Sequence, residues 1–184
     1  MWRKGTPPTL LVGMQIGAAT KENSIDITQN IKNGLKEYIT NSYLEKELDE
    51  KYKELELKLS ELDAEIKKTA TNATRNTIVV NSDALKYLEK YGFTVISLDE
   101  DKTSVSDKDI QNVLDLISAG DVKHLILLEN KENSEAVIKV LNESKIETYI
   151  FRRLDSITDS ERDELKDYLT IMNENINILK DELY

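Results

Sequence analysis

The feature that most constrains the fold is a regular alternation of apolar strands and amphipathic helices from Asn76 onward. Four runs rich in Val, Ile and Leu are predicted strands: Thr77–Asn81, Phe93–Leu98, Val122–Leu128 and Ile146–Phe151. Helical segments are predicted between them, near Asp83–Lys90, Asp107–Ala119 and Ser134–Asn142. Continuous apolar strands joined by helical crossovers are typical of parallel sheets covered on both faces. The pattern predicts an α/β fold with a four-stranded parallel sheet and helices on both faces.

The C-terminal region is predicted to be helical as well. It opens with a capping box from Thr158 to Glu161, in which side chains satisfy the first free N–H groups of a helix. Apolar residues then recur at helical spacing: Leu165, Leu169, Met172, Ile176, Leu179 and Leu183. Apolar residues at this spacing lie on one face of a helix.

The N-terminal part has a different pattern. Thr9–Met14 is predicted to be a short strand, and a helical pattern begins at Asp26. A long helix is predicted over Ser42–Ala70, with an apolar stripe from Leu44 to Ile66. We expect this stripe to pack against the chain's own α/β domain, with a coiled-coil dimer as the alternative. The predicted divisions are residues 1–25 (an irregular lead-in or remnant of an N-terminal lobe), 26–72 (the helices) and 73–184 (the α/β lobe).

Composition excludes several classes of partner. The 184 residues carry a formal net charge of -10, so nucleic acid and anionic membrane surfaces are poor partners. Cysteine is absent, which excludes disulfides and thiolate metal sites. No secretory signal is present, and no stretch approaches the roughly 20 apolar residues of a membrane helix.

Two stretches resemble a known family. Residues 77–98 read TIVVNSDALKYLEKYGFTVISL, and residues 168–183 read YLTIMNENINILKDEL. They resemble the C-terminal half of the solute-binding proteins of zinc and manganese ABC importers, a family of metal-binding lipoproteins and adhesins. In that family the first stretch reads roughly v-t-s-H-x-A-f-x-Y-x-x-x-Y-G, and the chain ends Y-x-x-M-M-x-x-N-x-x-x-L. The residues that fall in step are Ala84, Tyr87, Tyr91, Gly92, Tyr168, Met172 and Asn175.

The resemblance implies a non-catalytic function in metal ion transport. Family members bind zinc or manganese between two lobes and deliver it to an ABC permease, at the extracellular face of the bacterial membrane or in the periplasm. The long helix stands where the family's lobe-linking helix stands. The resemblance also implies that the signal, the lipid anchor and most of the N-terminal lobe lie outside this chain. We expect a monomer whose partner is the permease.

The resemblance also assigns candidate metal ligands. Asp155 matches a carboxylate ligand in the segment after the last strand, and Glu22 is the nearest match to a ligand that precedes the first helix. Ser82 stands where the family has a metal-binding His or Glu. A hydroxyl is a weak donor to zinc or manganese, so Ser82 is predicted to cap the helix that begins at Asp83. The fourth ligand belongs to the other lobe. We therefore expect an incomplete site that holds neither ion tightly.

Other chemistry finds little support. No G-x-G-x-x-G or P-loop follows any predicted strand and no cysteine nucleophile is present, which predicts that the chain is not an enzyme. His124, the single histidine, begins a strand and is predicted to be structural. Glu129 leaves the carboxyl end of its strand, where a ligand-facing role and a solvated loop both remain open.

Two alternatives come from other classes of function. In the first, the chain is an interaction or scaffold protein that uses the long helix or the acidic surface. In the second, it is a solute-binding lobe retuned to a non-metal ligand, with Arg152 and Arg153 facing an anion.

Overall fold

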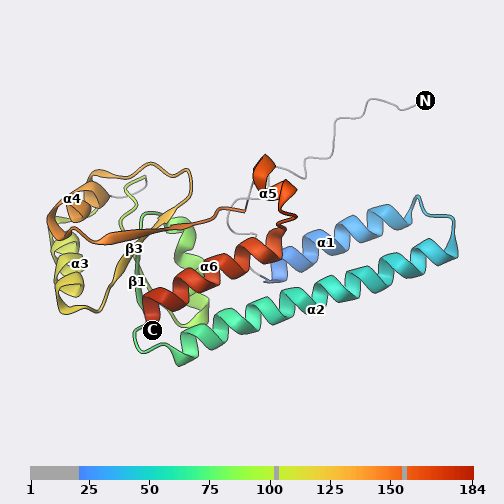
Figure 1. Cartoon of the computed structure of the whole chain (residues 1–184), viewed down its shortest axis with the longest axis horizontal. Coiled ribbons are helices and arrows are strands. Elements are labelled where there is room, and N and C mark those ends of the chain that lie inside the picture. Colours follow the sequence, from blue (N-terminus) through green and yellow to red (C-terminus); the bar gives the residue numbers. More distant parts are fainter. Residues whose placement is uncertain (1–20, 102–103, 155–156) are drawn as a thin grey trace. The chain divides into compact units, whose positions relative to one another are not determined.

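The computed structural model describes residues 21–101, 104–154 and 157–184 (Figure 1). The predicted strand Thr9–Met14 lies outside these residues. Its elements follow in the order α1 (Lys21–Lys36), α2 (Ser42–Asn72), β1 (Thr77–Val80), η2 (Asp83–Tyr91), β2 (Thr94–Ser97), α3 (Asp107–Ala119), β3 (His124–Leu128), α4 (Glu135–Ser144), β4 (Glu147–Phe151), α5 (Asp159–Asp163) and α6 (Tyr168–Leu183).

The chain divides into two compact units, Met1–Leu59 and Ser60–Tyr184, and the boundary falls inside α2. The second unit contains every strand that the structure describes. The predicted boundaries at residues 25 and 72 stay predictions.

The sheet of the second unit confirms the predicted fold class. Its four strands lie in the order β2-β1-β3-β4, and every pair of neighbours is parallel. The register places Val79 of β1 opposite Ile96 of β2 and Leu125 of β3. Because all strands point the same way, their carboxyl ends meet at one edge of the sheet.

One face of the sheet is covered by α3 and α4 (Figure 1). Both helices begin at a serine cap, Ser106 and Ser134, whose hydroxyl accepts a backbone N–H of the first turn. The buried residues of this layer are Val79, Leu98, Ile110, Val113, Val122, Leu125, Ala136, Val137 and Val140.

The opposite face is covered by η2, α6 and the C-terminal part of α2. Ile78 and Val80 flank Val79 and point to this face, because side chains alternate along a strand. Both are fully buried. The helices supply Leu62, Ile66, Leu85, Leu88, Met172, Ile176 and Leu179, all of them buried. Helices therefore lie on both faces of the sheet, as predicted.

Asn175 joins α6 to the end of β4. It is fully buried, its side-chain oxygen accepts the N–H of Arg152 at 2.9 Å, and its amide nitrogen donates to the carbonyl of Arg152 at 3.1 Å. The side chain thus bonds both backbone groups of one residue, as a neighbouring strand does. The asparagine of the C-terminal motif is a structural residue in this chain.

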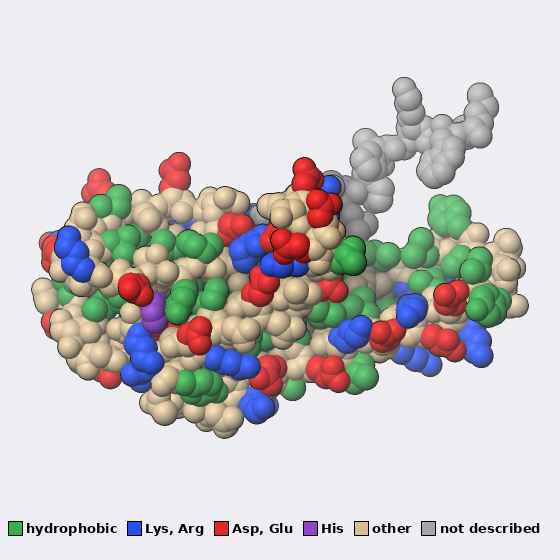
Figure 2. All heavy atoms as spheres, in the orientation of Figure 1, with side chains coloured by type: hydrophobic (Ala, Val, Ile, Leu, Met, Phe, Trp, Pro, Cys, Tyr) green, Lys and Arg blue, Asp and Glu red, His purple; other side chains and the backbone are tan. Residues whose placement is uncertain are grey.

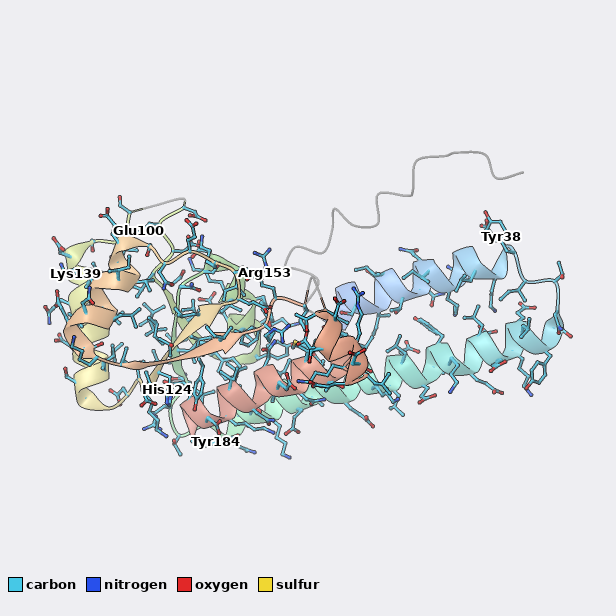
Figure 3. The ribbon with its side chains drawn as sticks, turned by 45° about the horizontal axis from the view of Figure 1, so that its top comes forward. Tyr38, Glu100, His124, Lys139, Arg153 and Tyr184 are labelled. Carbon is cyan, nitrogen blue, oxygen red and sulfur yellow. The ribbon has the colours of Figure 1, made fainter. Side chains whose placement is uncertain are left out.

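The first unit is a hairpin of α1 and the N-terminal part of α2. Lys36 pairs with Asp49 at 2.7 Å, and the ammonium of Lys32 lies 4.0 Å from the ring centre of Tyr52. Among the described side chains from Ser24 to Lys58 none is buried. Tyr38 is 85% exposed, at the turn between the two helices (Figure 3).

The predicted burial of the whole α2 stripe is wrong in its first part. Leu59, Leu62 and Ile66 are buried, whereas Leu44 is 48% exposed. The buried part of the stripe begins at the boundary of the α/β unit. Before that boundary, α1 packs on α2 within the hairpin, and two helices alone cannot enclose the apolar side chains between them.

Candidate metal-binding site

The carboxyl edge of the sheet collects the polar residues that follow each strand. Ser82 follows β1, Asp99 follows β2, Glu129 follows β3 and Arg152 follows β4. Open parallel sheets bind ligands at this edge, and the location of the metal site here stays a prediction.

Ser82 has the capping role that the sequence predicts. It is 5% exposed, and its Oγ accepts the N–H of Ala84 at 3.3 Å in the first turn of η2. The same hydroxyl donates to Oδ2 of Asp99 at 3.3 Å. Position 82, which the family resemblance predicts to be a metal-ligand position, therefore carries a short hydroxyl that is already engaged in two hydrogen bonds.

Asp99 is surrounded by donors. Oδ2 also accepts the N–H of Asp83 at 3.0 Å, while Oδ1 accepts the N–H of Asp101 at 3.0 Å and the ammonium of Lys131 at 3.2 Å. Burial alone raises the pKa of Asp99, but the hydrogen bonds from the two backbone N–H groups and from Lys131 outweigh it and hold that pKa below its ordinary value. Asp99 is therefore an ionised carboxylate with both oxygens in use.

A second ion-pair cluster lies at the end of β4. Arg152 pairs through Nε with Oε1 of Glu129 at 2.8 Å, and its two terminal nitrogens donate to Glu161 of α5. The guanidinium of Arg152, followed by the backbone N–H and hydroxyl of Thr158, lowers the pKa of Glu161 to about 2. The predicted role of Arg152 in facing an anion is wrong, because two carboxylates of the chain itself neutralise its charge.

The other two predicted ligands are not placed. Asp155 lies outside the described residues, and Glu22 lies in the first turn of α1 with its side chain outside the description as well. Within the described ranges, no three side chains of His, Cys, Asp or Glu are grouped so that they could hold a metal ion.

The structure clarifies the role of Glu129, which the sequence left open, and adds Lys131, which the sequence did not single out. Glu129 belongs to an ion pair, and its second oxygen accepts the N–H of Arg153 at 3.2 Å. A search for metal ligands does not single out Lys131, because an ammonium cannot ligate a metal. Its position three residues after β3, at the carboxyl edge, was the available signal.

His124 lies at the opposite end of the sheet and is structural, as predicted. Its Nδ1 is 2.9 Å from Oε2 of Glu182, a fully buried carboxylate on α6 that also accepts the N–H of Lys123 at 2.8 Å. The imidazole stacks on Tyr149, with 4.2 Å between ring centres. Figure 2 shows the histidine in purple, between acidic and basic side chains at the surface.

Solved structures of metal-binding lipoproteins share this fold. The chain is similar to the metal-dependent lipoprotein YcdH of Bacillus subtilis, with a TM-score of 0.68 and 20% identity over 90% of this chain and 62% of that one. It is similar to the Zn(II)-bound ZnuA-like domain of Streptococcus pneumoniae AdcA, with a TM-score of 0.63 and 17% identity over 89% of this chain and 61% of that domain. The laminin-binding adhesin Lmb of Streptococcus agalactiae gives a TM-score of 0.66 and 15% identity over 89% of this chain and 59% of that protein.

The sequence defines the family. The model of the family described as "Zinc-uptake complex component A periplasmic" matches residues 20–182, and the chain belongs to this family. No curated protein sequence matches significantly. The chain spans about three fifths of the length of the solved structures named above (62%, 61% and 59%). Along the described part of the chain, no helix is long and apolar enough to cross a membrane.

Proposed function

We propose that this chain is a non-catalytic substrate-binding component of an ABC importer for zinc, with manganese as the alternative cargo. The observation that carries the proposal is the family match from residue 20 to residue 182, which extends over both units of the fold. The Zn(II)-bound structure among those similar to it favours zinc. The family match gives no support to the scaffold alternative. The implied partner is the importer's permease, and the implied location is the periplasm or the extracellular face of the membrane.

We further propose that the metal site within this chain is incomplete. The hydroxyl of Ser82 is occupied as a helix cap, and the nearest carboxylate, Asp99, is saturated by donors. Asp155 and Glu22 are the remaining candidates from the ligand set that the family resemblance implies, and one or two oxygen donors leave a divalent ion largely hydrated. The chain on its own then binds zinc or manganese no better than a surface carboxylate cluster does.

The importer role is tested in the native cell. Deleting the gene should lower zinc uptake during zinc limitation, measured as cell-associated metal by mass spectrometry, and a plasmid copy should restore it. Unchanged zinc and manganese uptake in the deletion strain would contradict the proposed function.

The incomplete site is tested by calorimetric titration of metal-stripped protein. We expect dissociation constants on the order of 10⁻⁴ M or weaker, and Asp155→Ala as control should change little. Submicromolar binding that Asp155→Ala abolishes would show an intact site. Ser82→His restores the residue type of the family and should raise the affinity, provided that residues 82 and 155 face the same point.

A further inference from the structure

The side chain of Lys131 reaches the sheet edge beside Ser82 because of a tight turn after β3. Asn130 adopts a left-handed conformation with φ of 57°, and the N–H of Lys131 bonds the carbonyl of Leu128 at 3.2 Å. The ammonium then lies 3.2 Å from Oδ1 of Asp99 and forms a second, very close ion pair with Asp101. The turn thus delivers a positive charge to the acidic residues that follow β2.

The environment of this ammonium keeps it charged and in place. The Lys131 side chain is 19% exposed and that of Asp99 only 10% exposed, so the pair is shielded from water. Hydrogen bonds to Asp101 and Asp99 raise the pKa of Lys131 against the opposing effect of burial. An ammonium with three donors and no acceptor satisfies carboxylate oxygens but cannot ligate a metal.

Ser82 and Lys131 bond to different oxygens of the same carboxylate, that of Asp99. Oδ2 of Asp99 receives the Ser82 hydroxyl, and Oδ1 receives the ammonium. A divalent cation bound by a side chain at position 82 would therefore meet a fixed positive charge across a single carboxylate. It would also compete with that charge for the oxygens of Asp99.

From this arrangement we propose that Lys131 is a specificity-determining residue. Its ammonium group occupies the sheet edge next to Ser82 and excludes divalent metal ions from that edge. The inference rests on the proposed function, since it concerns the same edge. The short hydroxyl at position 82 and the ammonium of Lys131 then act together against a divalent ion at this edge.

The test compares zinc affinities of three variants by competition with a chromophoric chelator. They are Ser82→His alone, Ser82→His with Lys131→Met, and Ser82→His with Lys139→Met. Lys139 is the matched control, because it forms an exposed ion pair with Asp107 at 2.9 Å and lies on α4 (Figure 3). Each methionine change removes one positive charge, so the global charge effect is the same, although Lys131→Met removes two lysine–aspartate pairs and Lys139→Met removes one.

We expect the variant with Lys131→Met to bind zinc about tenfold or more tightly than the variant with Lys139→Met. Ser82→His alone should resemble the Lys139→Met variant. Equal affinities of the two double variants would overturn the proposal, as would the absence of measurable zinc binding in all three. A purely structural role for Lys131 would lower stability without raising zinc affinity, and that outcome also overturns it.

Lys131→Gln serves as a second variant in case Lys131→Met does not fold. Its amide can donate to the same carboxylates but carries no charge, and the same gain in zinc affinity is expected. The uptake experiment on the native chain decides the proposed importer function separately. Lowered zinc uptake in the deletion strain together with equal zinc affinities of the two double variants would therefore reject the role of Lys131 and leave the importer function standing.

Discussion

Replacing Asn175 with alanine should destabilise the α/β unit strongly. The change removes the acceptor of the Arg152 N–H and the donor to the Arg152 carbonyl, which lie 2.9 Å and 3.1 Å from the Asn175 side chain. Both backbone groups then lose their partner beside a position that is fully buried in the native fold. Each buried group left unsatisfied costs about 1–3 kcal/mol. Since Arg152 is itself only half-buried, we take values near the lower end and expect a total loss of about 2–4 kcal/mol.

The assay is urea unfolding followed by circular dichroism, with thermal melts as a second measure. For a chain of this size, the expected loss corresponds to a drop in melting temperature of about 5–12 °C. The slope of the free energy of unfolding against urea should stay unchanged, because the same surface is exposed on unfolding.

Asn173→Ala is the matched control. Asn173 is on the same helix, is exposed, and donates to the carbonyl of Leu169 at 2.9 Å within its own helix. Substitution there should change stability by about 0.5 kcal/mol or less. The two variants are compared by their loss of free energy of unfolding. A difference of less than about 1 kcal/mol between Asn175→Ala and Asn173→Ala would refute the idea that Asn175 replaces strand hydrogen bonds.

Three further outcomes are expected. Arg152 lowers the pKa of Glu161 to about 2, so the contribution of Glu161 to stability is complete above the ordinary pKa of 4.5 and disappears as the pH falls toward 2. In Glu161→Gln, the free energy of unfolding should therefore depend less on pH within this window. His124→Phe removes the contact with the buried carboxylate of Glu182 and should cost about 1–3 kcal/mol in urea unfolding, and adding Glu182→Gln should recover part of it. Gly92 has a φ of 104° with nothing near a built Cβ, so Gly92→Ala should cost about 1–2 kcal/mol through backbone strain alone, and an unchanged melting temperature would contradict this.

The strands could be predicted because their sequences are apolar without interruption. Thr77–Val80 and His124–Leu128 are strands with almost no exposed side chain, and a continuous Val, Ile and Leu pattern indicates this type of burial. The spatial order β2-β1-β3-β4 was not predicted, because the pattern along the chain does not say which strands become neighbours.

The candidate site was predicted less completely. The cap at Ser82 could be predicted, since a cap depends on residues adjacent in sequence. The capping box of Thr158 and Glu161 was predicted for the same reason and is confirmed. The ion pairs of Lys131 and Glu161 could not be predicted, because their partners, Asp99 and Arg152, lie on other elements. The sequence offers Arg152 as an anion-binding residue, and only the fold brings Glu161, nine residues further on, to its guanidinium.

The exposed hairpin has a consequence for the way in which α2 loses its structure. Hydrogen bonds open most easily where few apolar contacts hold a segment, and Leu59 is the first buried position of α2. Amide hydrogens in the helix before Leu59 should therefore exchange with solvent much faster than those around Ile66. A single continuous helix would then show a steep gradient of protection along its length, with the N-terminal turns fraying while the C-terminal turns persist until the α/β unit itself unfolds.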